Sequence, residues 1–187
     1  MCSPPDSGQG SLMATHRLLL LRHAKSDWAE GDTPDAQRPL ADSGLRACTL
    51  VARHLRDHNL APDLILCSAA LRTRQTVEGI ATALPAGVPV VTEDRLYLAE
   101  AETLLDRLRD VDDGVPTVLL VGHNPGIHTL AVALLAATDR PRIPTYPTAA
   151  LAVEDLLVPR WAELGQSTTR LASFVTPREL RESAGSS

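Results

Sequence analysis

Short apolar runs alternate with helical patterns along most of this 187-residue chain, and this alternation limits the fold more than any other feature. Four runs have only four or five residues, which suits a strand that is buried on both faces. They lie at residues 18–21, 64–67, 88–91 and 117–121. Pro89 favours an edge position for the third run, because proline cannot donate to a sheet ladder.

A helical pattern of apolar residues follows each of these runs. The four patterns lie at residues 43–59, 73–84, 101–111 and 127–137. Strands and helices that alternate with short links are typical of a parallel sheet covered by helices on both faces. We therefore expect an α/β fold, built as a three-layer α/β/α sandwich with a mostly parallel central sheet.

The pattern changes after residue 139, where prolines interrupt the segment 139–144. Two late strands are expected at residues 149–157 and 168–175. They follow one another without an intervening helical pattern, so we expect them to pair as an antiparallel hairpin at an edge of the sheet.

The two ends of the chain lack such periodicity. We expect a disordered N-terminal tail at residues 1–14, a single domain at residues 15–178 and a frayed C-terminal tail at residues 179–187. Met13 is a second candidate start besides Met1.

Composition excludes several classes of partner. Lys and Arg total 18 and Asp and Glu total 23, a formal net charge of −5 at pH 7. Such a chain is a poor match for nucleic acid, whose phosphates favour a basic surface. The 3 cysteines are too few and too scattered for a disulfide framework, and the longest early apolar run is too short to span a membrane. We therefore expect a cytoplasmic protein with no nucleic-acid or membrane partner.

Basic and imidazole side chains follow the ends of the expected strands, which is where open α/β sheets bind ligands. The first run leads into Arg22 and His23. The second leads into Arg72 and the fourth into His123, each at the start of a helical pattern. Two imidazoles and two guanidiniums are therefore expected to meet at one edge of the sheet, with Lys25 nearby.

This combination favours a phosphoryl group as the ligand. Guanidiniums bind phosphoryl oxygens in bidentate fashion, and helix N-termini add N–H donors. A neutral imidazole can attack phosphorus and form a covalent intermediate, while a second, protonated imidazole can stabilise the charge of the transition state. These cationic groups supply what a metal ion supplies elsewhere, so we expect no metal and no cofactor.

Several segments resemble those of the histidine phosphatase superfamily and occur in its order. They are Leu21-Arg22-His23-Ala24-Lys25-Ser26, Arg38-Pro39-Leu40 with Gly44, Ser68-Ala69-Ala70-Leu71-Arg72-Thr73-Arg74-Gln75-Thr76, and Val121-Gly122-His123-Asn124-Pro125-Gly126. The Ala-Lys-Ser form is similar to the short, SixA-like phosphohistidine phosphatase branch. The resemblance covers about residues 17–177 and implies a phosphoglycerate mutase-like fold.

The resemblance also implies roles for individual residues. His23 would be the nucleophile that becomes phosphorylated, and Arg22, Arg72 and His123 would hold the phosphoryl group. Ser26 stands where larger relatives have a phosphate-contacting Thr, although a hydroxyl that caps a turn explains Ser26 equally well.

The chain departs from larger members of the superfamily where they supply a general acid. The matching stretch, residues 95–100, has apolar or small residues at the relevant place, which leaves Glu100 and Asp27 as weak candidates. An alkyl phosphate needs a proton on its leaving oxygen, whereas phosphohistidine releases an imidazole with a reference pKa of about 6.5.

The sequence therefore favours phosphohistidine on a protein as the substrate. A phosphatase of a small phosphorylated metabolite and a non-catalytic module that binds a phosphorylated ligand are the two alternatives.

Several other residues resemble parts of a metal or catalytic site but are interpreted as structural. His54 and His58 lie four residues apart, but no third metal ligand is evident. Cys67 has only four residues between it and Arg72, one fewer than the loop of cysteine phosphatases, and is interpreted as a buried apolar residue. His128 and Arg74 are expected to be incidental residues of their helices.

Overall fold

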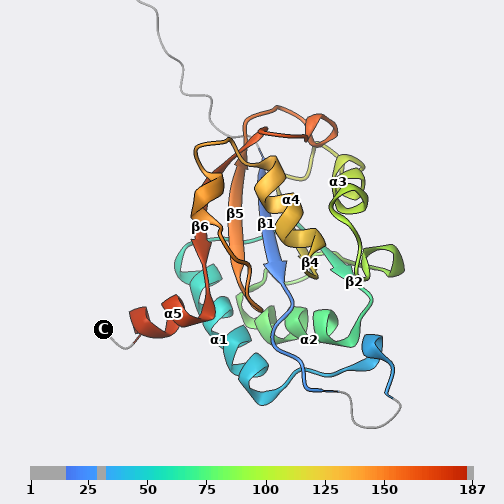
Figure 1. Cartoon of the computed structure of the whole chain (residues 1–187), viewed down its shortest axis with the longest axis vertical. Coiled ribbons are helices and arrows are strands. Elements are labelled where there is room, and N and C mark those ends of the chain that lie inside the picture. The colour runs from blue at the N-terminus through green and yellow to red at the C-terminus, as the bar shows by residue number, and fades with distance from the viewer. Residues whose placement is uncertain (1–15, 29–32, 185–187) are drawn as a thin grey trace, which may run out of the picture.

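A central sheet of six strands organises the protein, whose computed structural model describes residues 16–28 and 33–184 (Figure 1). The strands are β1 (Arg17–Arg22), β2 (Leu64–Ser68), β3 (Val90–Glu93), β4 (Thr117–Gly122), β5 (Leu151–Leu156) and β6 (Thr169–Val175). Their order in the sheet is β3-β2-β4-β1-β5-β6. Strand β5 is antiparallel to the other five, which confirms the expected mostly parallel sheet. Strand β3 lies at one edge, as Pro89 predicts, and β5 and β6 form the expected antiparallel pair at the other edge.

Helices cover both faces of this sheet. They are α1 (Asp42–Asp57), α2 (Leu71–Ile80), α3 (Ala101–Arg109), α4 (Gly126–Leu134) and α5 (Pro177–Ala184). Apolar residues of α1 and α2 form one buried cluster with the sheet, and those of α3 and α4 form another. The expected three-layer α/β/α sandwich is therefore confirmed.

Strand β1 lies between these two clusters. Leu18 and Leu20 belong to the cluster under α3 and α4, whereas Leu19 and Leu21 belong to the cluster under α1 and α2. All four side chains are fully buried. The strand is a continuous apolar run because both of its faces are covered. Burial of each leucine side chain contributes about 1.5–3 kcal/mol to the free energy of folding.

Most expected boundaries differ from the observed ones by one or two residues, and the ends of two helices differ by more. The second helical pattern is expected to run to residue 84, but α2 ends at Ile80 and a short 3-10 helix, Ala81–Ala83, follows it before Pro85. The fourth helix ends at Leu134 rather than at residue 137. In both places the apolar periodicity continues into a segment that packs on the core in another backbone conformation.

Helix α5 includes residues 179–184, which the sequence pattern places in the C-terminal tail. The carboxylate of Glu179 accepts hydrogen bonds from the backbone N–H and the hydroxyl of Thr176, both at 2.8 Å. Pro177 lies within this capping box, at the first helical position. Leu180 packs against the apolar cluster under α1 and α2. Residues 185–187 and the expected tail at 1–14 lie outside the described residues.

Candidate active site

The loops that follow β1, β2 and β4 meet at the carboxyl edge of the sheet. These strands are parallel neighbours, with β4 between β1 and β2, so their C-terminal ends point toward the same side (Figure 1). Arg22 and His23 follow β1, Arg72 lies in the first turn of α2, and His123 follows β4. The expected convergence of these loops on one edge is therefore observed.

The hydrogen bond of the His23 ring decides which of its two nitrogens is unprotonated. Its Nδ1–H donates a 2.8 Å hydrogen bond to the Ala24 carbonyl, and a carbonyl can only accept. Burial and, to a smaller extent, the charges of Arg72 and Arg22 together lower the pKa of His23 to about 4, against the opposing effect of the Ala24 bond. The ring is therefore neutral near pH 7, and Nε2 keeps a free lone pair. The residue retains 8 % of its surface exposed.

His123 lies beside His23, with 5.1 Å between the ring centroids. Its Nδ1 is 3.4 Å from an Arg72 guanidinium nitrogen, which can only donate, and its Nε2 is 2.7 Å from the hydroxyl of Ser68. Burial, together with His23 and Arg72, lowers the pKa of His123 to about 3. His123 is thus neutral, and it can act as a cation only after a bound anion has raised its pKa.

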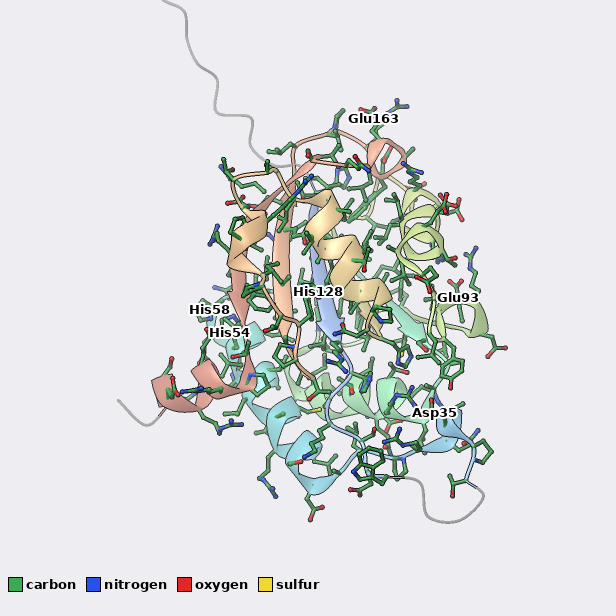
Figure 2. All side chains as sticks on the ribbon, viewed as in Figure 1. Asp35, His54, His58, Glu93, His128 and Glu163 are labelled. Carbon is green, nitrogen blue, oxygen red and sulfur yellow. The ribbon has the colours of Figure 1, made fainter. Side chains whose placement is uncertain are left out.

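Arg72 is buried and paired with a carboxylate that sequence reasoning missed. One guanidinium nitrogen lies 3.0 Å from Oδ2 of Asp35, and the other donates to the Asp35 carbonyl at 2.7 Å. The hydroxyl of Tyr97 also donates to Oδ2, at 2.6 Å, and Arg38 donates to Oδ1 at 3.0 Å. Asp35 lies on the short helix η1 (Asp35–Gln37), at the lower right of Figure 2.

Asp35 is consequently an anion. The hydrogen bond from Tyr97 is the largest influence on its pKa, and with Arg38 and Arg72 it outweighs partial burial and lowers that pKa to about 2. No periodicity or motif marks Asp35 in the sequence, since its partners Arg72 and Tyr97 are 37 and 62 positions away.

Arg22 reaches the same region through the loop before β5. Its guanidinium and the side-chain amide of Asn124 both donate to the Tyr146 carbonyl, at 2.8 and 3.0 Å. Within the described residues, Nε of Arg22 and Oδ1 of Asn124 are buried without a hydrogen-bond partner. Burial, followed by the charge of Arg72, lowers the pKa of Arg22, so an anion between the two guanidiniums would relieve an existing repulsion.

Two side chains of α2 connect the loops to one another. The hydroxyl of Thr76 accepts a hydrogen bond from the Ala24 N–H at 3.0 Å and donates to the Arg72 carbonyl at 2.6 Å. The side-chain carbonyl of Gln75 accepts from the Leu40 N–H at 2.7 Å. These contacts give the Gln-Thr pair that follows Arg72 in the sequence motif a positioning role.

The remaining candidates lie around this centre. Ser26 pairs through its backbone with Leu40, and within the described residues its side chain makes no hydrogen bond to the four central residues. Lys25 is exposed. Asp27 accepts a bond from Arg38 through its carbonyl, and Glu100 is the residue before α3, where its carbonyl accepts from Leu104. Neither carboxylate contacts the two histidines in the described part of the chain.

The structural interpretations of two other residues agree with the structure. Cys67 is fully buried and donates to the Ser68 carbonyl, and burial raises its pKa to about 12, so it is a neutral thiol. The side chain of Arg74 is exposed on α2.

The remaining histidines also stay outside the site. The rings of His54 on α1 and His58, the residue after α1, have centroids 4.1 Å apart, and the described residues place no third metal-ligating side chain beside them. His128 binds the Ile143 carbonyl and lines a separate cavity of about 440 Å³ beside α4.

Comparison with known proteins gives the same family for the sequence and the structure. The model of the histidine phosphatase superfamily (branch 1) matches residues 18–102. An uncharacterized protein of Mycobacterium tuberculosis is 36 % identical over 164 residues, which cover 84 % of this chain and 100 % of that protein. The crystal structure of the "putative phosphohistidine phosphatase SixA from Agrobacterium tumefaciens" is 33 % identical with a TM-score of 0.75, and the match covers 87 % of this chain and 98 % of that one.

The chain belongs to the histidine phosphatase superfamily. A second SixA structure, from Nakamurella multipartitia, is 29 % identical with a TM-score of 0.76 over 87 % of this chain and 96 % of that one. The expected phosphoglycerate mutase-like fold is confirmed, and this histidine phosphatase is an enzyme of the hydrolase class. None of the helices in the described ranges has both the length and the apolar character that a membrane crossing requires.

The lowered histidine pKa values predict an unusual pH dependence. In a proton NMR titration the His23 ring should titrate near pH 4 and the His123 ring near pH 3, instead of near the usual histidine pKa of about 6.5. Because the unfolded chain binds these protons more readily, the neutral rings contribute stability above about pH 6.5, and this is lost as the pH falls toward 4. His23→Gln should remove one of the two transitions. Titration of either ring near 6.5 in the folded protein would contradict this account.

Proposed function

We propose that this protein hydrolyses phosphohistidine on a protein, through an intermediate in which His23 itself carries the phosphoryl group. The observation on which the proposal mainly rests is the bond from His23 Nδ1–H to the Ala24 carbonyl, which leaves Nε2 unprotonated beside two guanidiniums. The sequence and structural similarity to two SixA proteins supports the choice of substrate.

In the first step, Nε2 of His23 attacks the phosphorus atom. The bond between phosphorus and the substrate imidazole breaks, and that imidazole leaves as a neutral ring when its other nitrogen already carries a proton. Arg22 and Arg72 bind the phosphoryl oxygens and stabilise the charge that they carry in the transition state. His123 adds a hydrogen bond once the bound dianion has raised its pKa.

In the second step, a water molecule attacks the phosphorus atom of phospho-His23. The phosphorus–nitrogen bond breaks, inorganic phosphate leaves with both protons of the water, and the His23 ring returns to its neutral Nδ1–H tautomer. The Nδ1–H bond to Ala24 persists through both steps, so the same nitrogen receives and releases the phosphoryl group.

Asp35 bears on the choice between phosphohistidine and alkyl phosphates. It is the carboxylate that contacts Arg72 in this site, and its low pKa makes it an anion rather than a proton donor. An alkoxide leaving group needs a proton in the transition state, whereas an imidazole whose other nitrogen is protonated leaves as a neutral ring, with a conjugate-acid pKa of about 6.5, and needs no proton on the leaving nitrogen. The site therefore suits a phosphoramidate better than an alkyl ester.

We predict that kcat/KM for a phosphohistidine peptide exceeds that for an alkyl phosphate by more than tenfold, measured as phosphate release. The preference follows from the ionised state of Asp35 and the better leaving group. Both activities should persist in the presence of a chelator, because Arg22 and Arg72 supply the cationic charge.

Two results would contradict the proposal. A preference for the alkyl ester would favour a small phosphorylated metabolite as the substrate. Tight phosphate binding without hydrolysis of either compound would favour a non-catalytic binding module.

Truncation of the cationic and imidazole side chains tests their roles. Arg72→Ala and His123→Ala should each lower kcat/KM by a factor equivalent to about 2.7–4 kcal/mol, the usual cost of one donor that stabilises transition-state charge. His23→Ala should abolish turnover. Arg74→Ala is a matched control, because it removes an exposed arginine two residues along the same helix. If Arg72→Ala were as active as Arg74→Ala, Arg72 would not bind the phosphoryl group.

A further inference from the structure

A cavity of about 370 Å³ lies beside the His23 loop (residues 22–26) and is lined by cations. Lys25 of that loop and Arg178 and Arg181 of α5 line it, together with the hydroxyl-bearing residues Ser43, Thr148 and Thr176. None of the described residues that line it is Asp or Glu, although acidic residues outnumber basic ones in the chain as a whole. The cavity is therefore a local concentration of positive charge on an acidic protein.

The walls of the cavity are attached directly to the His23 loop. The N–H of Ala149, which follows Thr148, donates to the carbonyls of Arg22 and His23 at 3.1 Å. The N–H of Ala41 donates to the Lys25 carbonyl at 2.9 Å. At Gly44, the residue after Ser43, a Cβ would overlap that same carbonyl, so α1 approaches the loop closely.

The fold also places α5 at the edge of the sheet that holds His23. Strand β6 is parallel to β1, and Val175 at its end is in register with Leu151, which is in register with Leu21. Two strand spacings therefore separate the end of β6 from the end of β1, a distance of about 10 Å. Figure 1 shows α5 following β6 at this edge, next to α1.

Two of the three cations are available to a ligand. Lys25 and Arg181 form no ion pair with another described residue, whereas Arg178 is paired with Glu182 at 3.0 Å in a contact that is largely exposed. The carboxylate of Glu179 is engaged by Thr176 at the start of α5. A carboxylate ligand that entered the cavity would therefore meet unpaired positive charge on two of its sides.

We propose that this cavity binds acidic side chains of the phosphorylated protein, about three residues from its phosphohistidine. The inference rests on the proposed function and extends it to the recognition of the substrate. An extended chain advances about 3.3 Å per residue, so the separation of about 10 Å between the ends of β1 and β6, which lead into the His23 loop and α5, corresponds to about three residues. Complementary charge at this distance would attract and orient an acidic segment that the net charge of the enzyme otherwise repels.

The test compares two phosphohistidine peptides that differ only in charge. One carries Glu and the other Gln at the second, third and fourth positions on each side of the phosphohistidine. At low ionic strength we expect kcat/KM to favour the acidic peptide by about tenfold, because several exposed charge pairs act together, and we expect salt to reduce that ratio.

The contribution of the arginines is tested by measuring, for each variant, the ratio of kcat/KM for the acidic peptide to kcat/KM for the Gln peptide. Arg178→Gln combined with Arg181→Gln should lower the ratio from about tenfold to about twofold, because Lys25 still lines the cavity. Arg160→Gln is the matched control and should keep the ratio, since Arg160 pairs with Glu163 at the end of the molecule opposite Asp35 (Figure 2).

Three results would overturn the inference in distinguishable ways. A ratio near one in the unaltered enzyme, with both peptides hydrolysed, contradicts the acidic docking site alone. A ratio near one, combined with inhibition by pyrophosphate that Arg181→Gln weakens, would assign the cavity to a small anion. If neither peptide were hydrolysed while an aryl phosphate was, the proposed function would fail and the inference with it.

Discussion

The burial of several basic groups at one edge of the sheet, together with the repulsion between them, determines most properties of this site. Arg22 and Arg72 are close enough for the charge of Arg72 to lower the pKa of Arg22, and both arginines lower the pKa of His23. The histidines are neutral because burial and the arginines leave them no stable charged form. Asp35 compensates part of this charge through its ion pair with Arg72. A phosphoryl dianion would compensate more of it, since it can lie between both guanidiniums at once.

The fold maintains this arrangement through the apolar sheet and a few buried hydrogen bonds. The four buried leucines of β1 fix the strand between two helical layers, which sets where the His23 loop begins. Thr76 then joins that loop to α2, and Ser68 at the end of β2 holds the His123 ring. Loss of either hydroxyl would leave a buried polar partner unsatisfied and let a ring move, so these residues position the reacting groups without touching the substrate.

Much of the fold could be predicted from the sequence because its signals are local. The apolar runs and the helical patterns gave the layers and the parallel sheet, and the residues after each run gave Arg22, His23, Arg72 and His123. Asp35 and Tyr97 could not be found in this way, since their contacts join distant segments without any periodicity. Helix α5 is a different case: the capping box of Thr176 and Glu179 was present in the sequence, but the polar segment after it concealed the short helix.

The most direct test of this account is a crystal structure of the enzyme with bound vanadate, an analogue of the phosphoryl group in the transition state. We expect a bond from vanadium to Nε2 of His23, with Arg22 and Arg72 on the equatorial oxygens, His123 within hydrogen-bond distance and the Nδ1–H bond to Ala24 intact. Vanadate bound to Nδ1 of His23, or held at the edge of the sheet without contact to either guanidinium, would contradict it.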